Sequence, residues 1–233
     1  MPNEYTVNVR HRFNFAETPD LLYDKAYEVL SSLMPPWGLH GIVKKPLPQV
    51  KSNFMTGVSY TREVGRPVKS YSLGFQNRAH SKPPADLPMY DDVLLVVVRP
   101  KQLTPELVSS LLREALPRFV EAMRPYWMAL EEDGLGVEDA REKLPEGGTK
   151  ERVDFVDPRR GVNRIWPANY WDGELCRRAF NLTPEQVVQR LSSHVAEVRT
   201  INAGVLVIDS FDIPSDDAIR QIDARLRPLL SRR

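Results

Sequence analysis

The sequence predicts an α+β fold, in which a mostly antiparallel sheet carries helices packed on one face. Three observations predict this class. Runs typical of strands alternate along the chain with segments that repeat apolar residues every three to four positions. Several of the helix-like segments open on a Thr or Ser cap, often followed by proline. No long linker separates a second core, so residues 1–233 are predicted to form a single compact domain.

The N-terminal part of the chain begins with one strand and one helix. Residues 5–11 alternate apolar and polar side chains, which is typical of a half-buried strand. A helix is predicted to follow, with Thr18 as its cap and Pro35–Pro36 beyond its end. Residues 52–65 and 67–76 are predicted to hold short strands, with Gly- and Pro-rich loops around them.

The middle of the chain gives stronger signals. Residues 91–98 read as a strand buried on both faces, because their apolar run is continuous. A threonine-capped helix is predicted over 104–123, and Pro117 should kink or split it. Residues 124–133 then predict a strand, and 137–144 a short acidic helix.

The C-terminal part adds two strands and two helices. Residues 164–175 are strand-like, and the stretch around the single cysteine fits either a strand or a helix. A capped helix is predicted over 183–194, a buried strand over 203–212 and an amphipathic helix over 214–230.

Two of the predicted helices begin with the same four residues, Leu-Thr-Pro-Glu, at Leu103 and Leu182. This is a common way to start a helix, because threonine caps and proline fits the first turn. It also allows two sub-halves, at about 1–125 and 126–233, that face a common sheet. No extended repeat accompanies the motif.

Composition excludes several classes of function. The net charge is +1, from 32 basic and 31 acidic residues, so no global field favours nucleic acid or an anionic membrane. One cysteine rules out an internal disulfide and a cysteine-based zinc site. The longest apolar run, Val93–Val98, is far shorter than the roughly 20 residues of a membrane helix. The N-terminus lacks a signal-peptide pattern, and we therefore expect a cytoplasmic protein. We also expect a monomer or a weak homodimer.

No catalytic motif is evident. The sequence has no phosphate loop, no HExxH and no GxSxG, and its four histidines lack metal-ligand spacing. We therefore expect no cofactor, no metal and no enzymatic activity. The alternative is a small hydrolase that uses Cys176, or a cluster of Asp209, Asp212 and His194. Cys176 lies between Leu175 and a basic pair, and such a cysteine more often packs as a small hydrophobe.

One segment is strongly acidic and lies near aromatic residues. Residues 131–146 carry seven acidic and two basic side chains. A charge run is usually a solvated surface, but an acidic patch also speeds and selects association with a basic partner. Tyr and Trp are frequent anchors at interfaces and equally frequent in half-buried strands. The predicted partner-binding residues are Glu131, Glu132, Asp133, Glu138, Asp139, Glu142, Trp127, Tyr170, Trp171 and Asp172.

Two C-terminal segments resemble a known family. They are "GVNRIWPANYWDGELCRRAFNLTPEQVVQRL" and "AGVLVIDSFDIPSDDAIRQIDARLRPLL", over residues 161–191 and 203–230. In these segments the chain resembles the immunity protein 52 family of bacterial polymorphic toxin and type VI secretion systems. The rest of the chain matches only loosely, and none of the shared motifs is chemically diagnostic.

The resemblance implies a non-enzymatic inhibitor. Members of that family are encoded beside toxins with a restriction-endonuclease-like domain, and they protect the producing cell from the toxin's DNase activity. The family has no catalytic motif to carry over to this chain. The predicted function is therefore an immunity protein that binds a cognate nuclease toxin. Besides the hydrolase, an effector adaptor or chaperone remains an alternative.

Overall fold

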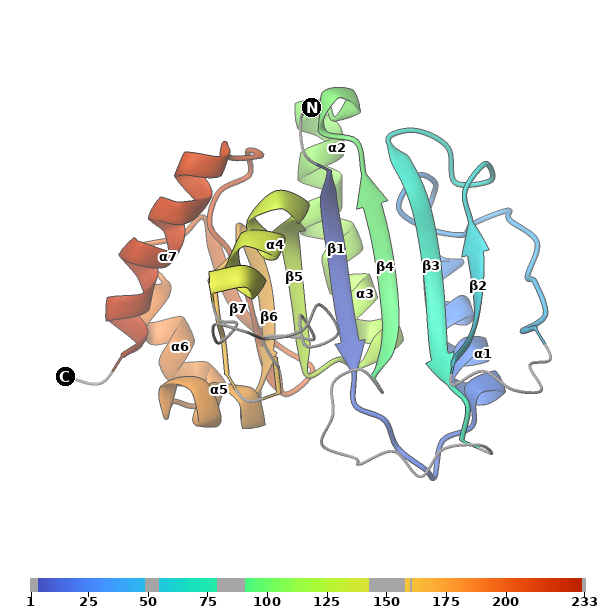
Figure 1. Cartoon of the computed structure of the whole chain (residues 1–233), viewed down its shortest axis with the longest axis horizontal. Helices are drawn as coiled ribbons and strands as arrows, with labels where there is room; N and C mark the ends of the chain where they lie inside the picture. The colour runs from blue at the N-terminus through green and yellow to red at the C-terminus, as the bar shows by residue number, and fades with distance from the viewer. Residues whose placement is uncertain (1–3, 49–54, 79–90, 143–157, 160, 232–233) are drawn as a thin grey trace.

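The fold is built on one antiparallel sheet of eight strands. The structure, a computed structural model, describes residues 4–48, 55–78, 91–142, 158–159 and 161–231, with backbone only at 137 and 139–142. The strands lie in the order β2-β3-β4-β1-β5-β6-β8-β7, and every neighbouring pair is antiparallel (Figure 1). The predicted α+β class is confirmed.

The strands are β1 Tyr5–His11, β2 Met55–Tyr60, β3 Val68–Gln76, β4 Asp92–Val98, β5 Trp127–Glu132, β6 Ala168–Asp172, β7 Glu197–Ile201 and β8 Gly204–Ile208. The helices are α1 Pro19–Leu30, α2 Pro105–Ser110, α3 Leu116–Met123, α4 Asp133–Glu142, α5 Gly173–Phe180, α6 Pro184–Leu191 and α7 Asp216–Leu230. Two short helical segments, η2 Pro100–Gln102 and η3 Leu111–Ala115, flank α2.

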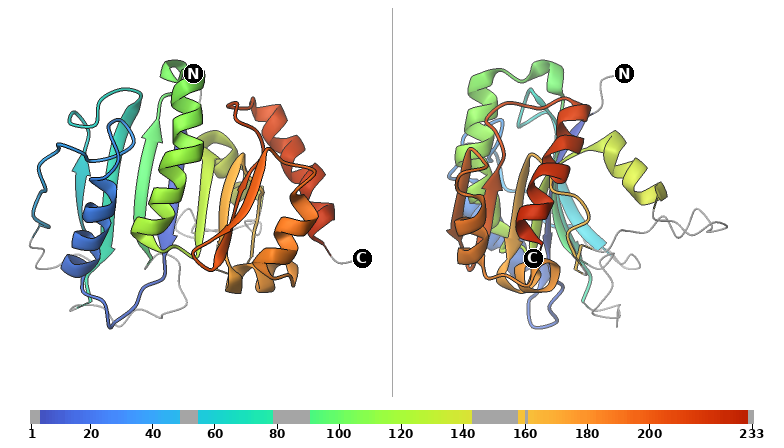
Figure 2. Two further views of the ribbon diagram at one scale, coloured as in Figure 1. Left: turned by 180° about the vertical axis from the view of Figure 1, so that it is seen from behind. Right: turned by 90° about the vertical axis from the view of Figure 1, so that its left-hand side faces the viewer.

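The packing of helices differs between the two halves of the sheet. In the first half, β2-β3-β4-β1, the ring of Tyr71 packs edge-on against Phe119 of α3. In the second half, β5-β6-β8-β7, the ring of Trp171 packs against Phe180 of α5. The strand register puts Tyr71 and Trp171 on opposite faces. Helices α1 and α3 thus lie on one face of the first half, whereas β6 and β8 of the second half are buried on both faces, so the predicted single covered face holds for the first half only (Figure 2).

Strand β4 differs from its prediction. Leu94, Val96 and Val98 are buried beneath the helices, but the residues between them on the opposite face are only partly buried. The prediction of a strand buried on both faces is therefore wrong. A continuous apolar run does not tell whether a second layer covers it, and the helices of this half lie on one side only.

The helix starts follow the predicted chemistry. Thr18, Thr104 and Thr183 each accept a hydrogen bond from the backbone N–H three residues on, with proline between them. At α6 this becomes a full capping box, since the Gln186 side chain accepts from the Thr183 N–H.

The helical segment 105–123 is interrupted next to Pro117. A π-helical turn, η3, separates α2 from α3 immediately before Pro117. Proline has no N–H and its ring crowds the carbonyl four residues back, and a wider turn relieves both problems. The predicted split is confirmed.

Among the described residues, no helix is both long and apolar enough to span a bilayer.

Candidate interaction surface

Three of the predicted acidic residues lie on β5 and α4, beside the centre of the sheet. We call Glu131, Asp133 and Glu138 the acidic edge. The Asn8 Nδ2 donates to Glu131 Oε2 at 2.9 Å, and the Thr6 Oγ1 donates to Asp133 Oδ1 at 2.8 Å. These bonds hold both carboxylates over the face of β1 that points away from α1 and α3.

The acidic edge is electrostatically crowded. Desolvation raises the pKa of Asp133, and the carboxylates of Glu4 and Glu132 add to the shift because they oppose another negative charge nearby. Glu138, on α4, is exposed and pairs with Arg220 of α7 at 2.5 Å. Asp139 and Glu142 lie on the same helix, but their side chains are outside the described part of the chain.

Next to the acidic edge lies the face of the first half of the sheet that none of the described helices covers. We call this surface the open face; its half-exposed side chains are Thr6, Asn8, Ser70, Ser72, Val93, Leu95 and Val97. Figure 1 looks onto it, with α1 and α3 behind the strands. A half-exposed aliphatic stripe flanked by hydroxyl and acidic groups is typical of a protein-binding surface.

Glu132 does not belong to this surface. Its residue is 1% exposed, and its Oε2 accepts from the Leu135 N–H at 2.6 Å. Strand alternation turns Glu132 to the face opposite that of Glu131, where it supports the first turn of α4. The prediction that Glu132 contacts a partner is wrong.

The three predicted aromatic contacts are also buried. Trp127, Tyr170 and Trp171 are 7%, 1% and 0% exposed. The Tyr170 hydroxyl donates to the Asn202 carbonyl at 3.0 Å, which satisfies its polar group inside the fold. Both faces of β5 and β6 lie in the core, so these rings pack internally, and the prediction that they bind a partner is corrected.

Asp172 caps a helix. Its Oδ1 accepts from the Leu175 N–H at 2.7 Å, and Arg12 lies 3.5 Å from its Oδ2. Burial raises the pKa of Asp172, while the bond to Leu175 and the charge of Arg12 act in the opposite direction. The stretch around Cys176 is therefore helical, and Asp172 is the residue that starts the helix.

A buried polar network lies where β1, β4 and β5 meet, and the sequence did not point to it. The Asp91 carboxylate accepts from Arg159 Nε at 3.0 Å, from Arg159 Nη2 and from the Tyr126 hydroxyl at 2.6 Å. Arg10 approaches the same carboxylate at 3.9 Å. Burial raises the pKa of Asp91 even beside these cations. The only sequence signal was the acidic pair before the apolar strand.

Its neighbour Asp92 forms a second pair on the other face of β4. Arg78 donates to both of its oxygens, at 2.8 and 2.6 Å, and the Gln76 N–H donates to one of them at 2.9 Å. The two adjacent aspartates thus fix β4 to different parts of the chain. We infer that both aspartates stabilise the fold.

The hydrolase alternative finds no support in the geometry. Cys176 is fully buried, and its Sγ lies 3.8 Å from the Trp171 carbonyl. Burial, together with the negative charges of Asp172 and Glu185, raises the thiol pKa to about 12. A nucleophilic cysteine needs the opposite environment.

In the predicted Asp and His cluster, Asp209 and His194 both contact Arg225. Arg225 pairs with the Asp209 carboxylate and donates to the main-chain carbonyl of His194 at 2.6 Å. Within the described part of the chain, no three His, Cys, Asp or Glu side chains are grouped to hold a metal; His80 lies outside that part.

We expect the Cys176 thiol to be unreactive in the folded protein. A thiol-specific disulfide reagent at pH 8 should label it only after denaturant is added, because both burial and the raised pKa suppress the thiolate. Rapid stoichiometric labelling without denaturant would contradict the buried position.

Comparison with known proteins gives one related fold. No family model and no curated protein matches the chain. Its structure is similar to that of the Pseudomonas aeruginosa T6SS protein PA0821, with a TM-score of 0.51 and 14% sequence identity. The match covers 97% of this chain and 71% of that protein. At this identity, the likeness shows that the chain shares its fold with a protein of the type VI secretion system.

Proposed function

We propose that this chain is a non-enzymatic immunity protein that binds and neutralises a secreted nuclease toxin in the cytoplasm of the producing cell. The observation that carries the proposal is the open face with its acidic edge. Two further facts agree with it: the fold resembles that of a type VI secretion protein, and the C-terminal sequence resembles an immunity family.

The charge of this surface suits a nuclease. A nuclease must bind phosphates, so its groove is basic. Glu131 accepts a hydrogen bond from Asn8, and Asp133 accepts one from Thr6, so both carboxylates are held in place on this surface. Complementary charge would guide the encounter, and the aliphatic stripe of β4 would supply desolvated contact area.

Co-expression with the toxin encoded beside this gene tests the function. We expect the cells to survive, and the two proteins to elute together from a sizing column. Cell death despite soluble expression, with no co-elution, would overturn the proposal. If deletion of the gene abolished effector export without self-intoxication, the adaptor function would replace it.

Charge reversal tests the surface. Changing Asp133 and Glu138 to lysine should slow association with the toxin about tenfold at low salt and weaken its salt dependence. The matched control is Glu121→Lys, an exposed acid on α3, behind the sheet. Surface plasmon resonance at two salt concentrations gives both quantities. Equal association rates for both variants and the unchanged protein would exclude the acidic edge from the interface.

A further inference from the structure

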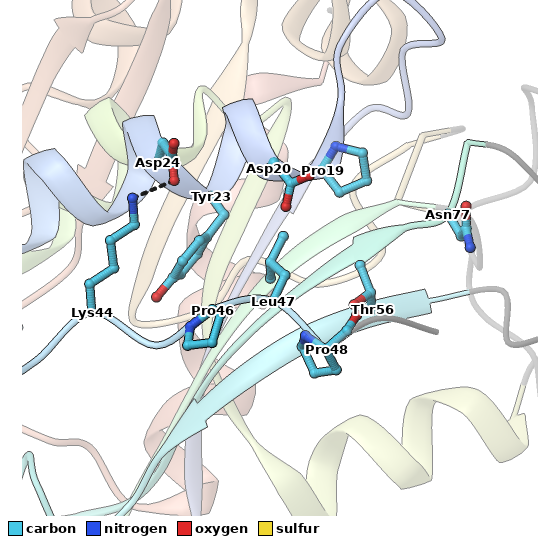
Figure 3. A pocket seen from close by; sticks show the side chains of 10 residues that line it. All are labelled: Pro19, Asp20, Tyr23, Asp24, Lys44, Pro46, Leu47, Pro48, Thr56 and Asn77. Carbon is cyan, nitrogen blue, oxygen red and sulfur yellow. Dashed lines mark hydrogen bonds and ion pairs between the residues drawn. The ribbon is translucent and has the colours of Figure 1, made fainter. Parts of the chain in front are cut away.

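A pocket of about 600 Å³ lies at the outer edge of the first half of the sheet. It is formed between the first turns of α1, the segment 44–48 and the edge strand β2 (Figure 3). This volume is in the range of sites that hold a small ligand or one large side chain, about 300–1,000 Å³. The pocket is distinct from the open face, since α1 lies on the opposite side of the sheet.

An ion pair between Lys44 and Asp24 lies at one end of the pocket. Lys44 Nζ lies 2.5 Å from Asp24 Oδ1. The same ammonium group is 5.6 Å from the centre of the Tyr23 ring and 5.8 Å from that of Tyr27. The Lys44 charge is therefore already engaged by a carboxylate and two aromatic rings.

The remaining charge in the pocket is negative. Asp20 is exposed in the first turn of α1, and within the described part of the chain no cation pairs with it. Since Asp24 and Lys44 neutralise each other, Asp20 gives the described lining of the pocket a net charge of about −1. The N-terminal turn of a helix is a favourable place for a negatively charged side chain.

The other walls combine apolar and polar groups. Leu47 projects between the α1 and β2 sides of the pocket, next to the proline rings of the same segment (Figure 3). Thr56 and Asn77 lie toward the end away from Lys44. A ligand with a flexible apolar stem and a single positive head group would therefore complement these walls.

We propose that this pocket binds an arginine or lysine side chain presented by a protein partner. The aliphatic stem lies against Leu47, and the cationic head meets the Asp20 carboxylate. Arginine and lysine are the natural side chains that combine a long apolar stem with a full positive charge. The identity of the partner as a basic nuclease rests on the proposed function; the binding of a basic side chain does not.

A titration followed by NMR tests the pocket without any toxin. The probe is Nα-acetyl-L-argininamide, and acetyl-norleucinamide serves as a neutral probe with a similar stem. We expect saturable shifts at the amides of Asp20, Leu47 and Thr56 with the arginine probe, at low-millimolar concentration, and none with norleucine. Asp20→Asn should weaken binding at least fivefold, because the carboxylate supplies the charge.

Glu185→Gln is the matched control. Glu185 follows the same Thr-Pro cap at the start of α6, is fully exposed and lies outside the pocket. It should leave probe binding unchanged. Non-saturable shifts, equal binding by Asp20→Asn, or equal binding of norleucinamide would each overturn the proposal. A failed toxin co-purification with intact probe binding would reject the proposed function alone.

Discussion

Replacing Arg159 with methionine is expected to lower the free energy of unfolding by about 3–5 kcal/mol. The side chains of Arg159 and Asp91 are 7% and 0% exposed, and the guanidinium group makes two hydrogen bonds to one carboxylate oxygen. Without Arg159, the aspartate stays buried, with Tyr126 and the more distant Arg10 as its remaining polar neighbours among the described side chains. An uncompensated buried charge is among the largest costs that a single substitution can impose.

The loss should depend on pH. Burial raises the folded-state pKa of Asp91 above its unfolded value of about 3.9, and removing a cation raises it further. A raised folded pKa means that the neutral acid favours folding, and that this benefit disappears as pH rises through the folded pKa. The defect should therefore be smallest below the unfolded pKa of about 3.9 and should grow as pH rises through the folded pKa of Asp91.

Urea denaturation at several pH values measures this effect. The control is Arg118→Met, since the Arg118–Glu121 pair is 43% and 47% exposed. We expect that change to cost less than about 1 kcal/mol at every pH. Equal losses for the two variants would show that Asp91 does not depend on Arg159.

The second large effect concerns the tryptophan-rich segment. Trp171→Ala should cost about 3–5 kcal/mol, because it removes a fully buried indole from between β6 and α5. The Trp171 ring lies 5.1 Å from that of Phe180 and its strand pairs with Trp127, so the cavity would be lined on several sides. Circular dichroism in urea measures the loss without relying on tryptophan fluorescence.

Met34→Ala provides the comparison, because Met34 is 65% exposed and its truncation leaves no cavity. It should change stability by less than about 0.5 kcal/mol. If the Trp171→Ala protein kept its stability but no longer bound the toxin, Trp171 would be a partner contact and not a core residue. Loss of stability instead confirms its role in packing.

The sequence predicted most elements because their signals are local. Threonine caps located the starts of α1, α2 and α6, and Pro117 located the break before α3. Alternation located β1, whose Tyr5, Val7 and Val9 are buried. Each of these signals depends on residues within a few positions of one another.

Strand β7 was not predicted, because its local sequence signal is weak. It is a five-residue edge strand that contains Glu197 and Arg199, and so its apolar pattern is weak. The turn to β8 uses Asn202 and Ala203, both with positive φ, where Asn-Gly would have marked a hairpin.

The candidate surface was predicted only in part, because burial is a tertiary property. Alternation separates Glu131 from Glu132, but nothing near them in sequence says which face a helix covers. For the same reason, Trp127, Tyr170 and Trp171 were predicted to bind a partner, although these side chains are buried in the core. Asp91 and Arg159 are 68 positions apart, and only the completed fold brings them together.

The central place of β1 has a consequence for how the chain folds. This first strand joins the two halves of the sheet, yet its neighbours β4 and β5 come later in the chain than β2 and β3. Thr6, for example, meets Asp133 across 127 positions. Such distant pairing slows folding, because the entropy of closing a long loop is lost before any contact repays it. During synthesis β1 therefore has no partner strand until β4 is made, and its second edge keeps unpaired backbone groups, which a chaperone or another chain can reach, until β5 is complete.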